Sequence, residues 1–292
     1  MRVAVTGSSG LIGSALVASL ERDGHEVLRL RRGEHWDPQA GTVTPGALAG
    51  VDAVVNLAGE GIAEKRWTSA QKQEIRGSRI KGTTAIADAC ASAGVATLVS
   101  GSAIGFYGSP GAIAVDESAP AGDDFLAHLV VDWEAATQSA SAAGVRVVHA
   151  RTGIVQARSG GMLKRQLPLF KFGLGGRLGR GQFYFSWVTL DDEVRALRFV
   201  LDNVSVSGPI NLTAPNPVTN AEWTKALGRA VHRPAFLVVP TFALRLALGA
   251  ELVDSLLCSQ RVIPQKLLSA GFEFHHPTID EGLAWAVSPS AS

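Results

Sequence analysis

The chain has 292 residues, of which 46% are hydrophobic and 18% are charged, and its formal net charge is +1. This length accommodates one large domain or two coupled ones, and the composition is typical of a well-packed α/β protein. A nearly neutral chain has no bulk field to attract nucleic acid or a membrane surface, so neither is expected as a partner. The two cysteines, Cys90 and Cys258, lie far apart in apolar sequence and are expected to be reduced and buried.

The sequence contains no expected targeting or membrane segment. “MRVAVTGSSG” runs from the initiator directly into a strand and a glycine turn, which excludes a signal peptide there. The most hydrophobic late stretch, residues 235–251, is interrupted by Pro240 and Arg245 and is too short to span a bilayer. A cytoplasmic location is therefore expected.

Short apolar runs alternate with segments of helical periodicity through the first half of the sequence. Strands are expected within residues 2–6, 25–30, 51–59, 96–108 and 145–152, and helices within residues 10–24, 68–94 and 123–137. Thr68 is a suitable N-cap, and Gly24 and Gly94 are natural helix ends. The alternation predicts an α/β fold with a Rossmann-type, doubly wound parallel sheet.

The regular alternation fades after Arg151. Residues 158–187 are rich in glycine and basic residues and are expected to form a short helix, a glycine-rich loop and an extended piece that cover a site. A capped helix and a strand follow, and the remainder is mostly helical. We therefore expect a dinucleotide-binding domain over residues 1–155, with 188–215 returning to it. A smaller, mostly helical substrate-side region is expected over 156–187 and 216–292.

The segment “VAVTGSSGLIG” places Gly7, Gly10 and Gly13 between the first strand and the first helix. A tight turn and the close approach of a pyrophosphate to a helix N-terminus both require backbone without Cβ atoms, so this context predicts a dinucleotide site. The residues expected to bind the cofactor lie in this turn and at the ends of the following strands: Thr6, Gly7, Ser9, Gly10, Leu11, Ile12, Gly13, Arg31, Arg32, Asn56, Leu57, Ala58, Gly59 and Ser100.

The end of the second strand, “LRLRRGE”, indicates the nucleotide. A site for NAD usually has an acidic residue here that binds the ribose hydroxyls. This chain instead has Arg31 and Arg32, whose guanidinium groups can pair with a 2′-phosphate in a bidentate way. NADP(H) is therefore the expected cofactor; the alternative is that the arginines form a solvated basic edge.

Several motifs resemble those of the short-chain dehydrogenase/reductase superfamily, especially its extended branch of sugar-nucleotide epimerases and dehydratases. They are T-G-x-x-G-x-x-G, “NLAG”, “SGSAIGFYG” and “FSWVTLDDEVRAL”. “FLAHLVVDWEAA”, “RTGIV” and “GPINLTAPNPVTNAEW” are similar to one atypical epimerase-like family, labelled nucleoside-diphosphate-sugar epimerase or cell-division-inhibitor-like. That family ends in an extension of unknown function, and the resemblance covers nearly the whole chain.

The resemblance implies that a serine, a tyrosine and a lysine four residues after the tyrosine perform the proton chemistry. Ser102 is the expected serine, with Ser100 as the second choice. In the predicted helix over residues 123–137 the tyrosine position falls at Leu126 and the lysine position at Val130, and the helix contains neither residue type. Its apolar residues have the spacing of a core stripe, so this helix is expected to be structural.

Other residues are weaker substitutes for the missing pair. Tyr107 and Glu60 are the expected catalytic replacements beside Ser102; the alternatives are packing next to the cofactor for Tyr107 and a loop-edge carboxylate for Glu60. His128 is expected on the surface. Asp191 and Asp192 are expected to cap a helix rather than to bind metal, because no His or Cys cluster supports a metal site.

Basic residues in two loops are candidates for contact with a substrate. Lys65, Arg66 and Trp67 are placed to close over a ligand beside the nicotinamide, and Arg177 and Arg180 lie among glycines that suit an anionic ligand. The alternative for the second loop is a mobile segment with solvated arginines.

The sequence therefore favours an NADP(H)-binding, epimerase/dehydratase-like oxidoreductase that lacks the Tyr-x-x-x-Lys pair. Its substrate is expected to be a nucleotide-linked or small carbonyl compound. The alternative is a non-enzymatic NADP(H)-binding redox sensor or regulatory protein, which the missing pair favours. By analogy with extended-branch relatives, a homodimer is a further expectation.

Overall fold

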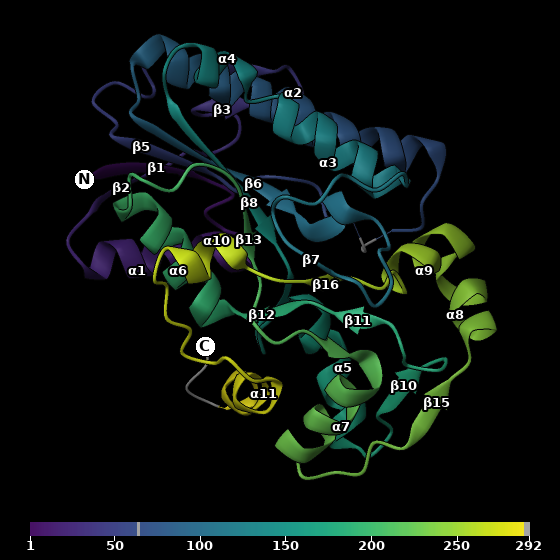
Figure 1. Cartoon of the computed structure of the whole chain (residues 1–292). Helices are drawn as coiled ribbons and strands as arrows, with labels where there is room; N and C mark the ends of the chain where they lie inside the picture. The colour runs from purple at the N-terminus through teal and green to yellow at the C-terminus, as the bar shows by residue number, and fades with distance from the viewer. Residues whose placement is uncertain (63–64, 289–292) are drawn as a thin grey trace.

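The computed structural model describes residues 1–62 and 65–288. Its centre is a six-stranded sheet in the order β13-β8-β6-β5-β1-β2, and all neighbouring strands run parallel (Figure 1). The strands are β1 (Arg2–Thr6), β2 (Glu26–Arg29), β5 (Ala53–Asn56), β6 (Thr97–Ala103), β8 (Arg146–Thr152) and β13 (Gly208–Leu212). The predicted α/β fold with a Rossmann-type sheet is confirmed.

Helices cover both faces of the sheet, so most strand side chains are buried. One face packs against α1 (Leu11–Arg22) and α6 (Leu190–Asp202), and the other against α2 (Ser69–Ala93), α3 (Phe125–Ala135) and α4 (Gln138–Ala142) (Figure 1). Successive strand residues point to opposite faces. Val3 and Val5 therefore join the core under α1 and α6, while Ala4 joins the core under α2 and α4.

The long helix α2 begins and ends where the sequence predicts. The Thr68 hydroxyl accepts a hydrogen bond from the Gln71 backbone N–H, and Gly94 ends the helix with a positive φ of 66°. Helix α3 begins with its apolar stripe at Phe125, because the Asp124 side chain caps it; it is therefore shorter than the predicted range of residues 123–137.

The strand order creates a crevice at the carboxyl end of the sheet. The chain leaves β1 through α1 to reach β2 on one side, and it leaves β5 through α2 to reach β6 on the other. Ligands of open α/β sheets bind where the strand order reverses in this way. Between β2 and β5 the connection contains only a hairpin of β3 (Trp36–Asp37) and β4 (Thr42–Val43), outside the main sheet.

The smaller region has its own core, in which Leu163, Trp187, Trp223 and Leu283 are fully buried. Its helices are α5 (Gly161–Lys171), α7 (Asn220–Ala230), α8 (Thr241–Leu248), α9 (Ala250–Leu256) and α11 (Ile279–Val287). Short strand pairs link it together: β9 (Ile154–Gln156) with β12 (Trp187–Thr189), β10 (Gly176–Leu178) with β15 (Leu237–Val239), and β11 (Tyr184–Phe185) with β14 (Val218–Thr219).

The C-terminal part of the chain returns to the sheet before it ends. Strand β16 (Arg261–Val262) pairs with β7 (Ala114–Val115), and α10 (Gln265–Ser269) packs against β13. Leu267 and Phe272 join the core under α1 and α6. The predicted division between residues 1–155 with 188–215 and the remainder stays a prediction, but this segment packs with the first part.

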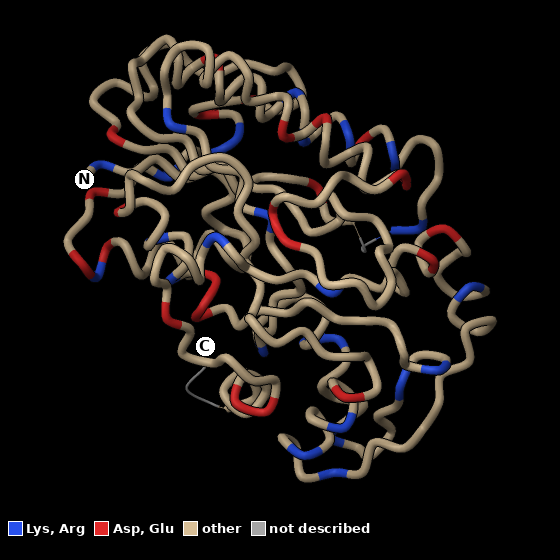
Figure 2. Tube along the Cα trace, viewed as in Figure 1, with Lys and Arg blue, Asp and Glu red and all other residues tan. Residues whose placement is uncertain are grey.

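The two thiols differ in their surroundings. Both are free; Cys90 is buried as predicted, whereas Cys258 is only half-buried, so the prediction of two buried thiols is wrong for Cys258. No helix in the described part of the chain combines the length and apolarity needed to cross a membrane. Acidic and basic residues occur on most elements, in line with the net charge of +1 (Figure 2).

Candidate cofactor and substrate site

The turn between β1 and α1 leaves no room for side chains. Gly7 has a φ of 63°, and a Cβ atom there would lie 2.8 Å from the Leu57 carbonyl. A Cβ atom at Gly13 would lie 2.2 Å from the Gly7 carbonyl oxygen, which also accepts a hydrogen bond from the Gly10 N–H. The glycines therefore let the turn fold tightly against the end of β5.

The N-terminus of α1 is suited to an anion. Gly10 is its N-cap residue, with no side chain to occupy the first backbone N–H groups, and the first turn contains no acidic residue. Free N–H groups and the positive end of the helix dipole stabilise phosphate at such a position. The cradle thus fits the diphosphate of a dinucleotide, and diphosphate binding by these residues stays a prediction of the glycine spacing.

Three of the predicted cofactor residues lie beneath the crevice rather than in it. Thr6 donates a hydrogen bond of 2.6 Å to the Asn56 side chain and accepts one from the Ala58 N–H. Thr6, Asn56 and Ser100 are at most 1% exposed. These side chains fix the ends of β1, β5 and β6, and direct contact with a cofactor stays a prediction for them.

The predicted 2′-phosphate residues lie at the edge of the sheet. Arg31 and Arg32 follow β2 and are exposed. Arg29 is engaged elsewhere, because its guanidinium forms an ion pair of 2.7 Å with Glu21. Within residues 1–62 and 65–288 the Arg31 guanidinium has only a 3.9 Å contact with the exposed Glu34, so it is available to a ligand.

A cavity of about 240 Å³ lies at the carboxyl ends of β6 and β8. Carboxyl ends of parallel strands share one edge, and β6 is two strands from β1, so the cavity and the glycine turn lie along the same edge. At about 4.8 Å between neighbouring strands, this separation is roughly 10 Å. Leu126 and Val130, the positions predicted to correspond to the missing tyrosine and lysine, both line the cavity.

The wall of the cavity is mainly apolar. Its lining comes from α3, from the segments after β6 and β8, from β11 and from α9. The apolar side chains include Ile104, Leu126, Leu129, Val130, Trp133, Ile154, Phe185 and Leu256. The polar ones include Arg79, Asp124, Thr152, Tyr184, Ser186, Cys258 and Gln260.

Arg79 of α2 is the one basic residue among those described in this lining, and sequence reasoning missed it. Its Cζ atom lies 5.0 Å from the centroid of the Trp133 ring, and burial lowers its pKa to about 10, partly offset by nearby Glu60. No described residue forms an ion pair with it. Helical periodicity could have indicated its position, because Arg79 lies between the buried Ile75 and Thr83 on one face of α2.

Ser102 and Tyr107 are brought together, but behind the cavity wall. Ser102 donates a hydrogen bond of 2.6 Å to Glu134, and Arg151 donates to both Glu134 oxygens at 2.7 and 2.8 Å. Arg151 also donates to the Tyr107 hydroxyl, which in turn donates to Asn211 at 2.7 Å. Burial raises the pKa of Tyr107. Neither hydroxyl belongs to the cavity lining, and sequence reasoning missed Glu134 and Arg151.

The remaining substrate-side candidates are dispersed. Glu60 is half-buried beside Arg79, with the Lys65 ammonium 3.8 Å away, and does not line the cavity. Arg66 donates to the Leu246 carbonyl and so fastens α8. Trp67 donates to the Ile62 carbonyl, and its ring contacts Phe125.

The two arginines of the glycine-rich loop lie away from the cavity, since Arg177 and Arg180 are exposed and absent from its lining. His128 is exposed, as predicted, and forms an ion pair with Asp123.

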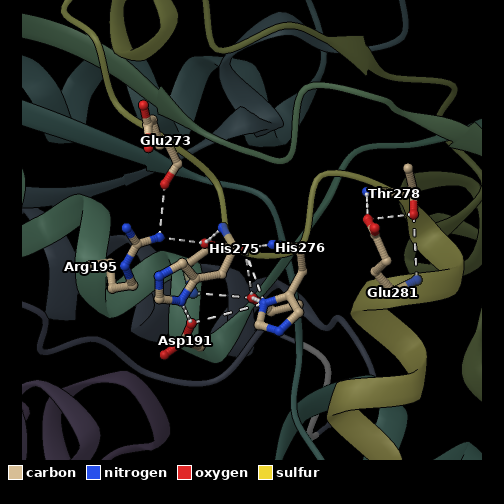
Figure 3. A network of polar contacts seen from close by, with 9 residues as sticks. Asp191, Arg195, Glu273, His275, His276, Thr278 and Glu281 are labelled. Atoms are coloured by element: carbon tan, nitrogen blue, oxygen red, sulfur yellow. Dashed lines mark hydrogen bonds and ion pairs between the residues drawn. The ribbon is translucent and has the colours of Figure 1, made fainter.

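Asp191 and Asp192 hold the C-terminal segment against α6. The Asp191 carboxylate lies against the His275 ring (Figure 3). Asp192 is 1% exposed and accepts hydrogen bonds from Thr189, from Arg195 and from the backbone N–H groups of His275 and His276. Asp191, Asp192 and His275 are close enough to surround an ion, but the Asp192 oxygens are already occupied, one of them by a cation. The predicted capping role is wrong, because the Thr189 side chain caps α6, but both aspartates lie in the first turn of α6, where a negative charge suits the helix dipole as predicted.

Residues 3–212 match the NAD dependent epimerase/dehydratase family, and residues 239–286 match a domain of unknown function. The chain is 53% identical to an epimerase family protein of Mycobacterium bovis over 98% of its own length and 97% of that protein.

Two solved structures are similar over nearly the whole chain. Human epimerase family protein SDR39U1, solved with NADPH, is 33% identical with a TM-score of 0.89, over 98% of this chain and 99% of that one. The nucleoside-diphosphate sugar epimerase from Corynebacterium glutamicum is 36% identical with a TM-score of 0.80, over 98% of this chain and 59% of that one. The resemblance seen in the motifs is thereby confirmed: the chain belongs to the NAD dependent epimerase/dehydratase family.

Proposed function

We propose that the chain is an NADP(H)-dependent oxidoreductase that reduces or oxidises a small substrate in the cavity beside α3. Two features at the same edge of the sheet support this proposal: a bare diphosphate cradle after β1 and a mainly apolar cavity after β6 and β8. A dinucleotide lying along that edge has its phosphates at one place and its reactive ring at the other.

The preference for NADP(H) rests on the arginines after β2. Arg31 and Arg32 are exposed at the end of the strand, where a 2′-phosphate needs a cationic partner, and no acidic residue stands in their place. The human relative solved with NADPH supports the same choice. Gly7, Gly10 and Gly13 would receive the diphosphate.

When bound, NADPH supplies a hydride, so reduction of a carbonyl group also requires a proton for its oxygen. Most cavity groups that carry a proton are engaged. Thr152 donates to Glu193, Ser186 donates to the Gln260 carbonyl, and the Cys258 thiol, whose pKa burial raises to about 11, donates to the Asp254 carbonyl.

Tyr184 remains as the proton source. Its hydroxyl makes no hydrogen bond within the described part of the chain, and the Arg261 guanidinium lies 5.1 Å from its ring centroid. The side chain is half-buried, so water can return the proton after reaction. The catalytic role predicted for Ser102, Tyr107 and Glu60 stays a prediction, and their contacts favour a role in holding the site.

Binding of the two reduced nucleotides tests this proposal. We expect calorimetric titration to give tighter binding of NADPH than of NADH to the wild-type protein. Gly10→Asp should abolish binding, because its carboxylate would occupy the diphosphate position while still capping α1. Equal binding of NADPH by the wild type and the variant would contradict the assignment of the diphosphate to the glycine turn.

The second candidate is a non-enzymatic redox sensor. Leu126 and Val130 favour it, because the positions expected to move a proton are occupied by hydrocarbon. Tight NADPH binding without turnover across a panel of small carbonyl compounds would support the sensor. A cytoplasmic location and a homodimer stay predictions of the sequence.

A further inference from the structure

The lining of the cavity restricts what it can hold. Its volume of about 240 Å³ lies below the roughly 300–1,000 Å³ typical of sites for drug-sized ligands. Under the proposed function the reactive ring of the cofactor also needs access to this space. The cavity can enclose a small molecule, whereas a complete sugar nucleotide would have to extend out of it.

The charges of the lining are few and lie far apart. Among the described residues of the lining, Arg79 is the only cation and Asp124 the only carboxylate. Arg79 stacks on Trp133, whereas Asp124 caps the start of the same helix by accepting a hydrogen bond from the Ala127 N–H. Trp133 is nine positions after Asp124, which corresponds to about 13 Å along α3. The apolar side chains of Leu126, Leu129 and Val130 lie between them.

The guanidinium of Arg79 lies near one carboxylate, that of Glu60, which partly offsets the effect of burial on it but is itself paired with Lys65 at 3.8 Å. The hydrogen bond of Arg79 goes to the Ile75 carbonyl of its own helix, at 3.3 Å, and no ion pair to it occurs within the described residues. A desolvated cation beside an apolar cavity is costly unless an anion joins it. A carboxylate pairs with a guanidinium in a bidentate way, and its charge of −1 matches a single arginine. A diphosphate would require further cations, and the exposed Arg177 and Arg180 are not in the lining.

We propose that the substrate is a small, largely apolar oxo acid, or the matching hydroxy acid, whose carboxylate binds Arg79 at the Trp133 end of the cavity. This inference rests on the proposed function, because the oxo or hydroxy group is the part that would react. Hydride added to the carbonyl carbon and a proton added to its oxygen convert the oxo acid into the hydroxy acid, with NADPH oxidised to NADP⁺. The apolar body of the substrate lies along Leu126 and Val130, where the family's pattern has a tyrosine and a lysine.

Two matched arginines of α2 allow a controlled test. Arg79→Met removes the cation from the cavity and keeps the length of the side chain, and Arg79→Lys keeps a cation. Arg76→Met changes an arginine one turn earlier that pairs with Asp132 on the surface. Each protein is first titrated with NADPH. The NADPH-loaded protein is then titrated with 4-methyl-2-oxopentanoate, its methyl ester and UDP-glucose, following calorimetric heat and the fluorescence of the tryptophans, which include Trp133.

We expect the oxo acid to bind the loaded wild-type protein at least tenfold more tightly than the ester does. Arg79→Met should remove this preference, Arg79→Lys should retain part of it, and Arg76→Met should retain all of it, while NADPH affinity changes less than threefold in every variant. Equal binding of acid and ester, no binding of the acid, or tighter binding of UDP-glucose would overturn the inference and leave NADPH binding intact. A parallel loss of NADPH and oxo acid affinity in Arg79→Met would assign the arginine to the cofactor and overturn it too. If the wild-type protein did not bind NADPH, the proposed function itself would be contradicted.

Discussion

Arg151 binds Glu134 through two hydrogen bonds, of 2.7 and 2.8 Å, and so joins the end of β8 to α3. Their side chains are 3% and 11% exposed, and Ser102 and Tyr107 attach to the same pair from β6 and from the 3₁₀ turn Ile104–Tyr107. In this chain the residues nearest the expected serine therefore form a buried ionic cluster. The cluster fixes the position of α3, the helix whose apolar side chains line the cavity.

The buried pair predicts a large loss of stability when one partner is changed. Glu134→Gln leaves Arg151 buried without a countercharge, so the free energy of unfolding should fall by about 3–5 kcal/mol. Asp132→Asn is the matched control on the same helix, because its pair with Arg76 is exposed and worth at most about 1 kcal/mol. Urea unfolding of both variants measures the difference. Similar midpoints for the two variants would contradict the assignment of Glu134 to a structural cluster.

Replacing each of the two tyrosines of the chain by phenylalanine should have opposite effects on stability and on turnover. Tyr107→Phe leaves the buried Asn211 oxygen and an Arg151 N–H without a partner, so the free energy of unfolding should fall by about 1–3 kcal/mol. Tyr184→Phe removes a hydroxyl that has no hydrogen bond to any described residue, so the free energy of unfolding should change by no more than about 0.5 kcal/mol.

Turnover should respond in the reverse order. Tyr184→Phe removes the proposed proton donor, so kcat for an oxo acid should fall by about 10²–10⁴-fold. Tyr107→Phe should keep most of the wild-type kcat at temperatures at which this less stable variant is still folded. Thermal unfolding and single-turnover oxidation of NADPH on both variants give the comparison. A large loss of kcat confined to Tyr107→Phe would return the catalytic role to Tyr107.

Local signals explain which parts of this molecule were predictable. Gly7, Gly10 and Gly13 act within one turn, and Thr68 and Gly94 bound one helix, so short-range sequence patterns suffice for the cradle and for α2. The sequence alone likewise shows that residues 123–137 contain no tyrosine and no lysine.

The contacts of the site were not predictable in the same way, because they join distant segments. Asn211 approaches Tyr107 across 104 positions of the chain, and nothing near Tyr107 in sequence indicates its partner. A partial signal exists in β8, where His149 and Arg151 alternate with apolar residues in a strand that is buried on both faces. Such polar residues in a central strand require buried partners. The sequence therefore predicts a buried polar cluster here, but it does not indicate which other residues belong to it.

The cofactor preference can be reversed at the end of β2. Arg31→Glu combined with Arg32→Ala replaces two exposed cations by the acidic residue typical of NAD sites. We expect the ratio of NADPH to NADH affinity to fall by at least 100-fold, because a 2′-phosphate would then meet a carboxylate. Arg29→Ala is the control, since Arg29 is paired with Glu21. An unchanged ratio in the double variant would make Arg31 and Arg32 bystanders.

Glu193 predicts how the stability of the protein depends on pH. Its side chain is fully buried on α6, one oxygen accepts a hydrogen bond of 2.8 Å from Thr152, and the other has no partner among the described residues. Burial raises its pKa from the ordinary 4.5 to about 8. At neutral pH the folded protein therefore holds this carboxyl in its protonated form, whereas the unfolded chain releases the proton.

The sign of the effect follows from the number of protons bound. Between pH 4.5 and about 8 the folded state binds one proton more than the unfolded state at Glu193, so this contribution to the free energy of unfolding falls as pH rises. The total loss across this window should be roughly 3–5 kcal/mol. Glu193→Gln keeps an acceptor for Thr152 and cannot ionise, so its stability should lack this slope. Urea unfolding of both proteins at pH 5.5, 6.5, 7.5 and 8.5 isolates the contribution as the difference between the two curves. Parallel curves would mean that Glu193 is ionised in the folded protein, and that the unpartnered oxygen has a cation or water that offsets its burial.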